Sequence, residues 1–229
     1  MGYKEEKKGD DVYLIPEDEH THTLIWLHGL GDTAMGFHDV FTDTKNSFVP
    51  ETTKVVLLTA PNRAVTINMG MEMPAWFDYL KLSIKGIHDC VEFEHVQESK
   101  ERVNAVIEEE VEALDGDYKK ILIGGFSQGA ALSLYTALEH PKELGGVVSF
   151  SGHQLYNKVK DVNEEKKTLP IFAYHGEMDP TLIFFLAFPF YQQLKEADFN
   201  IQCDSESALG HSLSLKELEL AKSFISAIL

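Results

Sequence analysis

Short apolar runs alternate with longer amphipathic stretches along most of the chain, and no other feature of the sequence constrains the fold as strongly. The runs predicted to be strands are residues 23–27, 55–58, 121–123, 146–150, 171–174 and 199–203. The stretches predicted to be helices are residues 95–114, 127–139, 184–196 and 213–228. This alternation favours an α/β fold, with a mostly parallel central sheet and helices on both faces. We expect one such domain to span residues 1–229.

The chain is strongly acidic and poor in cysteine. Its formal net charge of −17 repels the phosphates of nucleic acids and of anionic lipids, so we expect no nucleic-acid partner. No apolar run has the length of a membrane helix, and residues 1–11 lack the apolar centre of a signal peptide. Two cysteines, Cys90 and Cys203, do not imply a disulfide framework. We expect a cytoplasmic protein without stable membrane insertion, and we leave open a weak homodimer.

The pentapeptide Gly125-Phe126-Ser127-Gln128-Gly129 lies between a predicted strand and a predicted helix. A G-x-S-x-G sequence in this context is typical of a nucleophile elbow, a tight turn that exposes a serine at the end of a strand. The two glycines lack the Cβ atom that would clash in such a turn. The helix that follows favours developing negative charge at its N-terminus. Ser127 is therefore the candidate nucleophile, and a glycine-rich turn with a capping serine is the alternative.

A serine nucleophile needs a base and a group that orients the base. In this fold the acid and the histidine follow the serine in the order Ser, Asp, His. Asp179 lies just after the predicted strand 171–174, with Glu177 as its competitor and a helix N-cap as its alternative role. His211 is the one histidine after Asp179 in the sequence. We expect Asp179 to hold the tautomer of His211, which would take the proton of Ser127.

Two backbone amides are candidate donors to an oxyanion. The amide of Gln128 follows the nucleophile directly, and the amide of Leu30 lies in the glycine-rich loop 28–32 after an early strand. A glycine turn is the alternative for that loop. Residues 62–85 fit no clean period and are rich in apolar side chains, including Met71 and Trp76. Long irregular connections of this kind are often binding loops or lids.

Taken together, these motifs resemble the acyl-protein thioesterase and small carboxylesterase family, also called lysophospholipase-like, which has the α/β-hydrolase fold. The resemblance implies removal of long-chain acyl groups, often palmitoyl, from protein cysteines, and hydrolysis of lysophospholipids or simple esters by some members. Leu30 and Gln128 match the oxyanion positions of the family, and Met71, Trp76 and Leu182 fall where it builds an acyl channel. The matching segments span most of the chain in order: residues 28–32, 60–62, 73–78, 124–129, 131–133, 175–180 and 210–212.

The sequence departs from the family pattern at three places that bear on the acyl channel. Ala130 stands where a second glycine often follows, and residues 151–155 lack the tryptophan common in the thioesterase branch. Residues 181–191 are unusually rich in phenylalanine. A carboxylesterase for short-chain esters is therefore one alternative function. A non-catalytic acyl-binding or partner-binding relative is the other, although the motifs for the triad and the oxyanion are all present.

Two clusters of histidines and acids could suggest a metal site, but neither has the spacing of a zinc site. The first is His20, His22 and His28, and the second lies within residues 88–95. We interpret both as solvated surface groups and expect no metal and no cofactor. The run of glutamates at 108–110 is interpreted as an exposed helix face.

Overall fold

The computed structural model describes residues 2–43, 45–81 and 90–229. Within these ranges, an eight-stranded sheet runs through the molecule. Its spatial order is β1 (Tyr3–Lys8), β2 (Asp11–Pro16), β4 (Thr53–Leu58), β3 (His22–Leu27), β7 (Ile121–Phe126), β8 (Gly146–Phe150), β9 (Ile171–Gly176) and β10 (Ile201–Glu206). Strand β2 pairs antiparallel with β1 and β4, and all other pairs are parallel. The prediction of a mostly parallel central sheet is confirmed.

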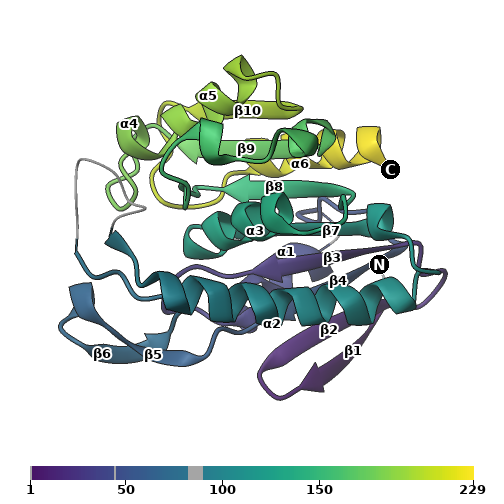
Figure 1. Cartoon of the computed structure of the whole chain (residues 1–229). Coiled ribbons are helices and arrows are strands. Elements are labelled where there is room, and N and C mark those ends of the chain that lie inside the picture. The colour runs from purple at the N-terminus through teal and green to yellow at the C-terminus, as the bar shows by residue number, and fades with distance from the viewer. Residues whose placement is uncertain (1, 44, 82–89) are drawn as a thin grey trace.

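Helices cover both faces of the sheet, as predicted (Figure 1). Alternate residues of each central strand point to opposite faces, so that Ile25 and Leu27 of β3 lie in one apolar cluster and Leu24 and Trp26 in the other. The first cluster is closed by α2 (Phe93–Glu112), α3 (Gln128–Glu139) and α5 (Pro189–Glu196). The second is closed by α1 (His38–Thr42) and α6 (Leu215–Ile228). No helix of the described ranges is long and apolar enough to cross a membrane.

Each predicted strand is present, within a few residues of its expected bounds. The predicted helix 184–196 is wrong in one respect, because it is divided into α4 (Phe184–Ala187) and α5. Pro189 opens α5, and a proline ring has no amide hydrogen and clashes with the preceding turn of a continuous helix. Because the helix is broken, the phenylalanine-rich residues 181–191 do not follow one straight helix. They lie beside the end of β9.

The segment 62–85 contains regular structure that its sequence period does not predict. Strands β5 (Asn62–Val65) and β6 (Met71–Pro74) form an antiparallel hairpin, with Asn62 opposite Pro74 and Val65 opposite Met71. The hairpin forms its own two-stranded sheet, apart from the central sheet (Figure 1). Residues 82–85 of the predicted lid lie outside the described residues. A lid function for this segment stays a prediction.

The prediction of an exposed glutamate face at residues 108–110 is wrong for Glu110. This side chain is 1% exposed, and it accepts hydrogen bonds from Lys54 Nζ at 2.6 Å and from Thr23 Oγ1 at 3.1 Å. Buried carboxylates are stable only when they are paired in this way. Glu110 therefore ties α2 to strands β3 and β4.

Candidate active site

Ser127 lies at a tight turn between the end of β7 and the start of α3. Its backbone has φ 55° and ψ −117°, a strained conformation for a residue with a side chain. A Cβ atom at Gly129 would lie 2.1 Å from the carbonyl oxygen of Leu27, and one at Gly125 would lie 2.5 Å from the same oxygen. Both positions therefore require glycine. The amide of Ser127 donates to Phe150 O at 2.8 Å, which anchors the turn to β8.

The structure brings the three predicted triad residues together from three different strand ends. His211 Nε2 lies 2.9 Å from Ser127 Oγ. His211 Nδ1 lies 2.6 Å from Asp179 Oδ2. Because Asp179 can only accept when ionised, Nδ1 carries the hydrogen and the lone pair of Nε2 faces the serine. This is the tautomer that a general base needs.

Asp179 is held by hydrogen bonds on both of its oxygens. Oδ1 accepts the backbone amides of Thr181 and Leu182, each at 2.8 Å. Burial alone would raise the pKa of Asp179, but hydrogen bonds from His175, His211 and the Leu182 amide outweigh burial and hold this pKa well below its usual range. The carboxylate therefore remains ionised beside His211 throughout the neutral pH range.

The competing acid, Glu177, points elsewhere. Its carboxylate accepts a hydrogen bond from Ser205 Oγ at 2.7 Å and is exposed. His211 itself is half-buried, and its ring packs against that of Phe126 with centroids 4.8 Å apart. The structure thus favours Asp179 over Glu177 as the partner of His211.

The two predicted oxyanion donors are backbone amides without a protein acceptor. Among the hydrogen bonds of the described ranges, neither the Leu30 amide nor the Gln128 amide has a partner. A Cβ atom at Gly29 would lie 3.4 Å from Ser127 Cβ, so the loop that carries Leu30 packs directly against the candidate nucleophile. Unpaired amides beside a nucleophile can bind the negative oxygen of a tetrahedral intermediate.

Side-chain hydrogen bonds hold the segment after β6 against this turn. The buried side-chain amide of Gln128 accepts from the Trp76 backbone amide at 2.7 Å through Oε1 and donates to Phe77 O at 2.8 Å through Nε2. The Trp76 indole donates to His28 O at 2.9 Å. These contacts link the loop that carries the Leu30 amide to the turn that carries the Gln128 amide.

The three predicted acyl-contacting residues occupy different environments. Trp76 is completely buried, so in this conformation its ring supports the oxyanion loop and does not line an open channel. Met71 is 54% exposed on β6, and Leu182 is half-buried beside Asp179. Exposed apolar side chains follow Leu182, with Ile183 at 48% and Phe185 at 79%.

The interpretation of the N-terminal histidines as solvated surface groups is wrong for His28. It is 1% exposed, and its Nε2 accepts the Ala60 amide at 2.9 Å while Nδ1 lies 2.6 Å from Gly29 O. Burial lowers the pKa of this imidazole. Within the described residues, no three His, Cys, Asp or Glu side chains gather as a metal site; His88 and Asp89 lie outside them.

No sequence motif predicts a role for His175 or His153, and both are buried beside the site. His175 is the penultimate residue of β9, four residues before Asp179, and this spacing is the one signal that could have identified it. His153 belongs to the segment 151–155, in which the resemblance leads one to expect a tryptophan, and its Nε2 lies 2.8 Å from the Tyr79 hydroxyl. Burial lowers the pKa of His153 to about 4.

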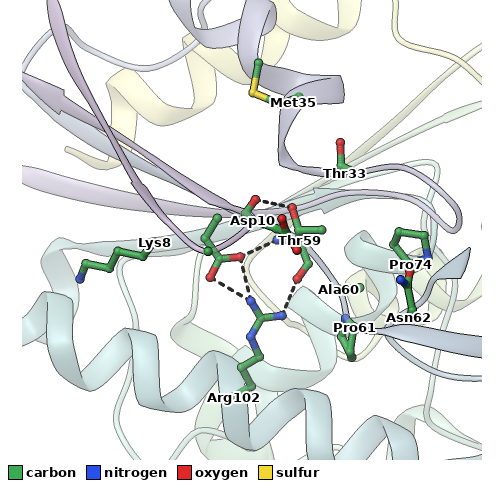
Figure 2. Close-up of a pocket in the computed structure, with 12 residues that line it drawn as sticks. Lys8, Asp10, Thr33, Met35, Thr59, Ala60, Pro61, Asn62, Pro74 and Arg102 are labelled. Atoms are coloured by element: carbon green, nitrogen blue, oxygen red, sulfur yellow. Dashed lines mark hydrogen bonds and ion pairs between the residues drawn. The ribbon is translucent and has the colours of Figure 1, made fainter.

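A hollow of about 640 Å³ lies near the oxyanion loop but contains none of the triad residues. Figure 2 shows that Arg102 and Thr59 lie at the centre of a hydrogen-bonded network in this hollow. Arg102 donates to Asp11 and to Thr59 O, and Asp11 accepts the Thr59 amide. This network fastens the β1–β2 hairpin to α2. The residues that line the hollow are Lys8, Gly9, Asp10, Asp11, Thr33, Met35, Thr59, Ala60, Pro61, Asn62, Pro74 and Arg102.

Sequence and structure comparisons place the chain among known hydrolases. Acyl-protein thioesterase 1 homolog 1 of Dictyostelium discoideum is 34% identical over 214 residues, which cover 92% of each protein. Carboxylesterase SOBER1 of Arabidopsis thaliana is 34% identical over 207 residues, which cover 88% of each. The crystal structure of SOBER1 has a TM-score of 0.78 at 31% identity, over 91% of this chain and 99% of that one.

The fold is therefore the predicted α/β-hydrolase fold. The family model described as Phospholipase/Carboxylesterase matches residues 11–229, which include the serine turn, both candidate oxyanion amides and the other two residues of the predicted triad. A match over nearly the whole chain decides the family. The chain belongs to the phospholipase/carboxylesterase family.

Proposed function

We propose that the protein is a serine hydrolase that cleaves acyl thioesters or esters through an acyl-serine intermediate. Ser127 is the nucleophile, His211 the general base and acid, and Asp179 the group that orients His211. The observation that carries this proposal is the continuous set of contacts from Ser127 Oγ to His211 at 2.9 Å and from His211 to Asp179 at 2.6 Å. Unpaired amides at Leu30 and Gln128 complete the site.

The reaction follows from the direction of these hydrogen bonds. His211 Nε2 removes the Ser127 proton as Oγ attacks the acyl carbonyl carbon, and the carbonyl oxygen becomes an anion held by the Leu30 and Gln128 amides. The carbon–sulfur or carbon–oxygen bond then breaks, and the leaving thiol or alcohol takes the proton from His211. Water, deprotonated by His211, attacks the acyl-serine, and the fatty acid leaves as Ser127 regains its proton.

We propose long-chain acyl groups on protein cysteines as the main substrates. Several relatives of this length are named acyl-protein thioesterases, including those of Dictyostelium discoideum and Neurospora crassa. Met71 and Leu182, together with the exposed Ile183 and Phe185, supply apolar surface for a chain. Each methylene that is fully buried contributes about 0.8 kcal/mol. Lysophospholipids present the same acyl chain on an oxygen ester and are a second substrate of the same kind.

Hydrolysis of short-chain esters is the second candidate function, because SOBER1 is named a carboxylesterase and is as similar to this chain as the thioesterases are. A series of acyl thioesters from two to sixteen carbons separates the two. We expect kcat/KM to rise with chain length, whereas a flat or falling series favours the short-chain function.

Substitution of the nucleophile tests whether the chain is an enzyme at all. Ser127→Ala should abolish hydrolysis of both thioester and ester substrates while preserving the fold. Retention of near wild-type activity would rule out the proposed mechanism. A folded wild-type protein that hydrolyses none of the series would favour a non-catalytic acyl-binding relative.

A cytoplasmic location fits the low cysteine content, because proteins without disulfides are typical of reducing compartments. We propose that location together with, at most, weak self-association. Fractionation of cells and sedimentation of the purified protein test these two statements separately.

A further inference from the structure

A second histidine contacts the carboxylate of Asp179. His175 Nε2 lies 3.3 Å from Asp179 Oδ2, and neither side chain is accessible to solvent. The same oxygen accepts the hydrogen bond from His211 Nδ1 at 2.6 Å. Asp179 Oδ2 is therefore shared between two imidazole rings, of which only His211 also reaches the serine.

The contacts of His175 assign its tautomer. Nε2 faces two acceptors, Asp179 Oδ2 and the Leu182 carbonyl oxygen at 2.8 Å, so the hydrogen lies on Nε2. Nδ1 is buried and has no hydrogen-bond partner among the described residues. The ring packs against Phe184 and Phe188, with centroids 5.9 and 6.4 Å away. A proton on Nδ1 would be buried without an acceptor, which is costly, and the ring is therefore neutral.

His175 also fixes the turn that carries the carboxylate. Asp179 Oδ1 accepts the amides of Thr181 and Leu182, and the carbonyl of Leu182 accepts from His175 Nε2. The ring belongs to β9, a fully buried strand in the interior of the sheet. One imidazole thus joins a rigid strand, the turn after it and the carboxylate in a single hydrogen-bonded unit.

We propose that His175 is a positioning residue of the active site: its Nε2–H, bonded to the Leu182 carbonyl and 3.3 Å from Asp179 Oδ2, fixes the turn that holds the Asp179 carboxylate and thereby sets the orientation and basicity of His211. This inference rests on the proposed function. An N–H group 3.3 Å from Oδ2 stabilises the negative charge of the oxygen that His211 uses, so His211 is a weaker base with His175 present than without it. Among the described residues, His153 is a further titratable side chain that interacts with His175, and with a pKa of about 4 it stays neutral in the assay range.

The pH profile of kcat/KM distinguishes this role from simple packing. His175→Leu removes the donor. We expect kcat to fall about 10- to 100-fold, because losing a polar contact with a charged group typically has an effect of this size. The acid limb of kcat/KM should also move to higher pH, by up to about one unit. His175→Gln places an amide N–H near the position of Nε2 and should restore much of kcat and most of the wild-type position of the acid limb. Phe188→Leu loosens the packing of the same ring without removing the donor, and it should keep the wild-type acid limb.

Three results would overturn the proposal: an acid limb unchanged in His175→Leu with kcat within about twofold of wild type, a Gln variant no better than the Leu variant, or the same shift in Phe188→Leu. Should His175→Leu fail to fold, the wild-type protein provides the test. Its imidazole ¹⁵N spectrum should show His175 as the neutral Nε2–H tautomer, and an Nδ1–H tautomer would refute the assignment. Loss of activity in Ser127→Ala, measured in parallel, keeps this test separate from that of the proposed function.

Discussion

Glu217 offers a sharp test of the structure, because it is a carboxylic acid buried without a charged partner. Its side chain is completely shielded from solvent, and Oε1 has no hydrogen-bond partner among the described residues. Oε2 accepts the Ser214 amide at 3.2 Å at the start of α6. Burial is the main cause that raises the pKa of Glu217 from 4.5 to about 8, and the nearby charge of Glu206 adds to it.

The raised pKa makes stability depend on pH in a defined direction. Below pH 4.5 the acid is neutral in both states, and between pH 4.5 and about 8 the unfolded chain releases a proton that the folded protein keeps. Stability is therefore lost as the pH rises through this window. The loss between pH 5 and pH 9 is about 4 kcal/mol by linkage, on the order of 10 °C in Tm.

Glu217→Gln removes the ionisation and keeps an oxygen acceptor for Ser214. We expect the variant to resemble wild type at pH 5 and to be more stable at pH 9, by an amount approaching the full linkage value. Chemical denaturation at a series of pH values measures the difference. Glu219→Gln on the same helix is the matched control, because Glu219 is exposed and its substitution should have the same small effect at every pH. A Glu217→Gln difference that does not grow with pH would refute the reasoning.

Three further substitutions, two of them with a matched control substitution, test other parts of the structure. Asp179→Asn should reduce kcat about 10⁴-fold, with the fold intact by circular dichroism, because the amide favours the wrong tautomer of the base. Gly129→Ala should abolish stable folding, since its Cβ would lie 2.1 Å from a carbonyl oxygen, whereas Gly210→Ala, with 4.0 Å of room, should have a normal Tm. Glu110→Ala should cost about 3–5 kcal/mol in urea unfolding, because it leaves a half-buried lysine unpaired. The exposed Glu109→Ala should cost under about 1 kcal/mol.

The central strands and the site motifs could be predicted because both depend on local sequence. Strand β8 is a continuous apolar run bounded by breaks, and the serine turn has glycines at both positions where a Cβ would clash. Strand β1 could not be predicted in the same way. It is an edge strand with the sequence YKEEKK, in which nearly every side chain is exposed, so no apolar period marks it.

The environments of single polar residues could not be predicted, because they depend on partners far along the chain. Glu110 resembles its exposed neighbours in sequence, and its partners in the buried position, Lys54 and Thr23, lie fifty-six and eighty-seven residues away. His28 and His175 are likewise defined by contacts that form when strand ends meet. Trp76 is predicted to contact an acyl chain, and its burial and the hydrogen bond of its indole to the carbonyl of His28, forty-eight residues away, could not be predicted.

The central claim is that Ser127 is activated by His211, and covalent labelling tests it most directly. Wild-type protein treated with a fluorophosphonate probe and digested should carry the adduct on the peptide that contains Ser127. His211→Ala should label at least about 10³-fold more slowly, since the serine loses its base. An adduct on a different residue, or an equal labelling rate without His211, would contradict the account.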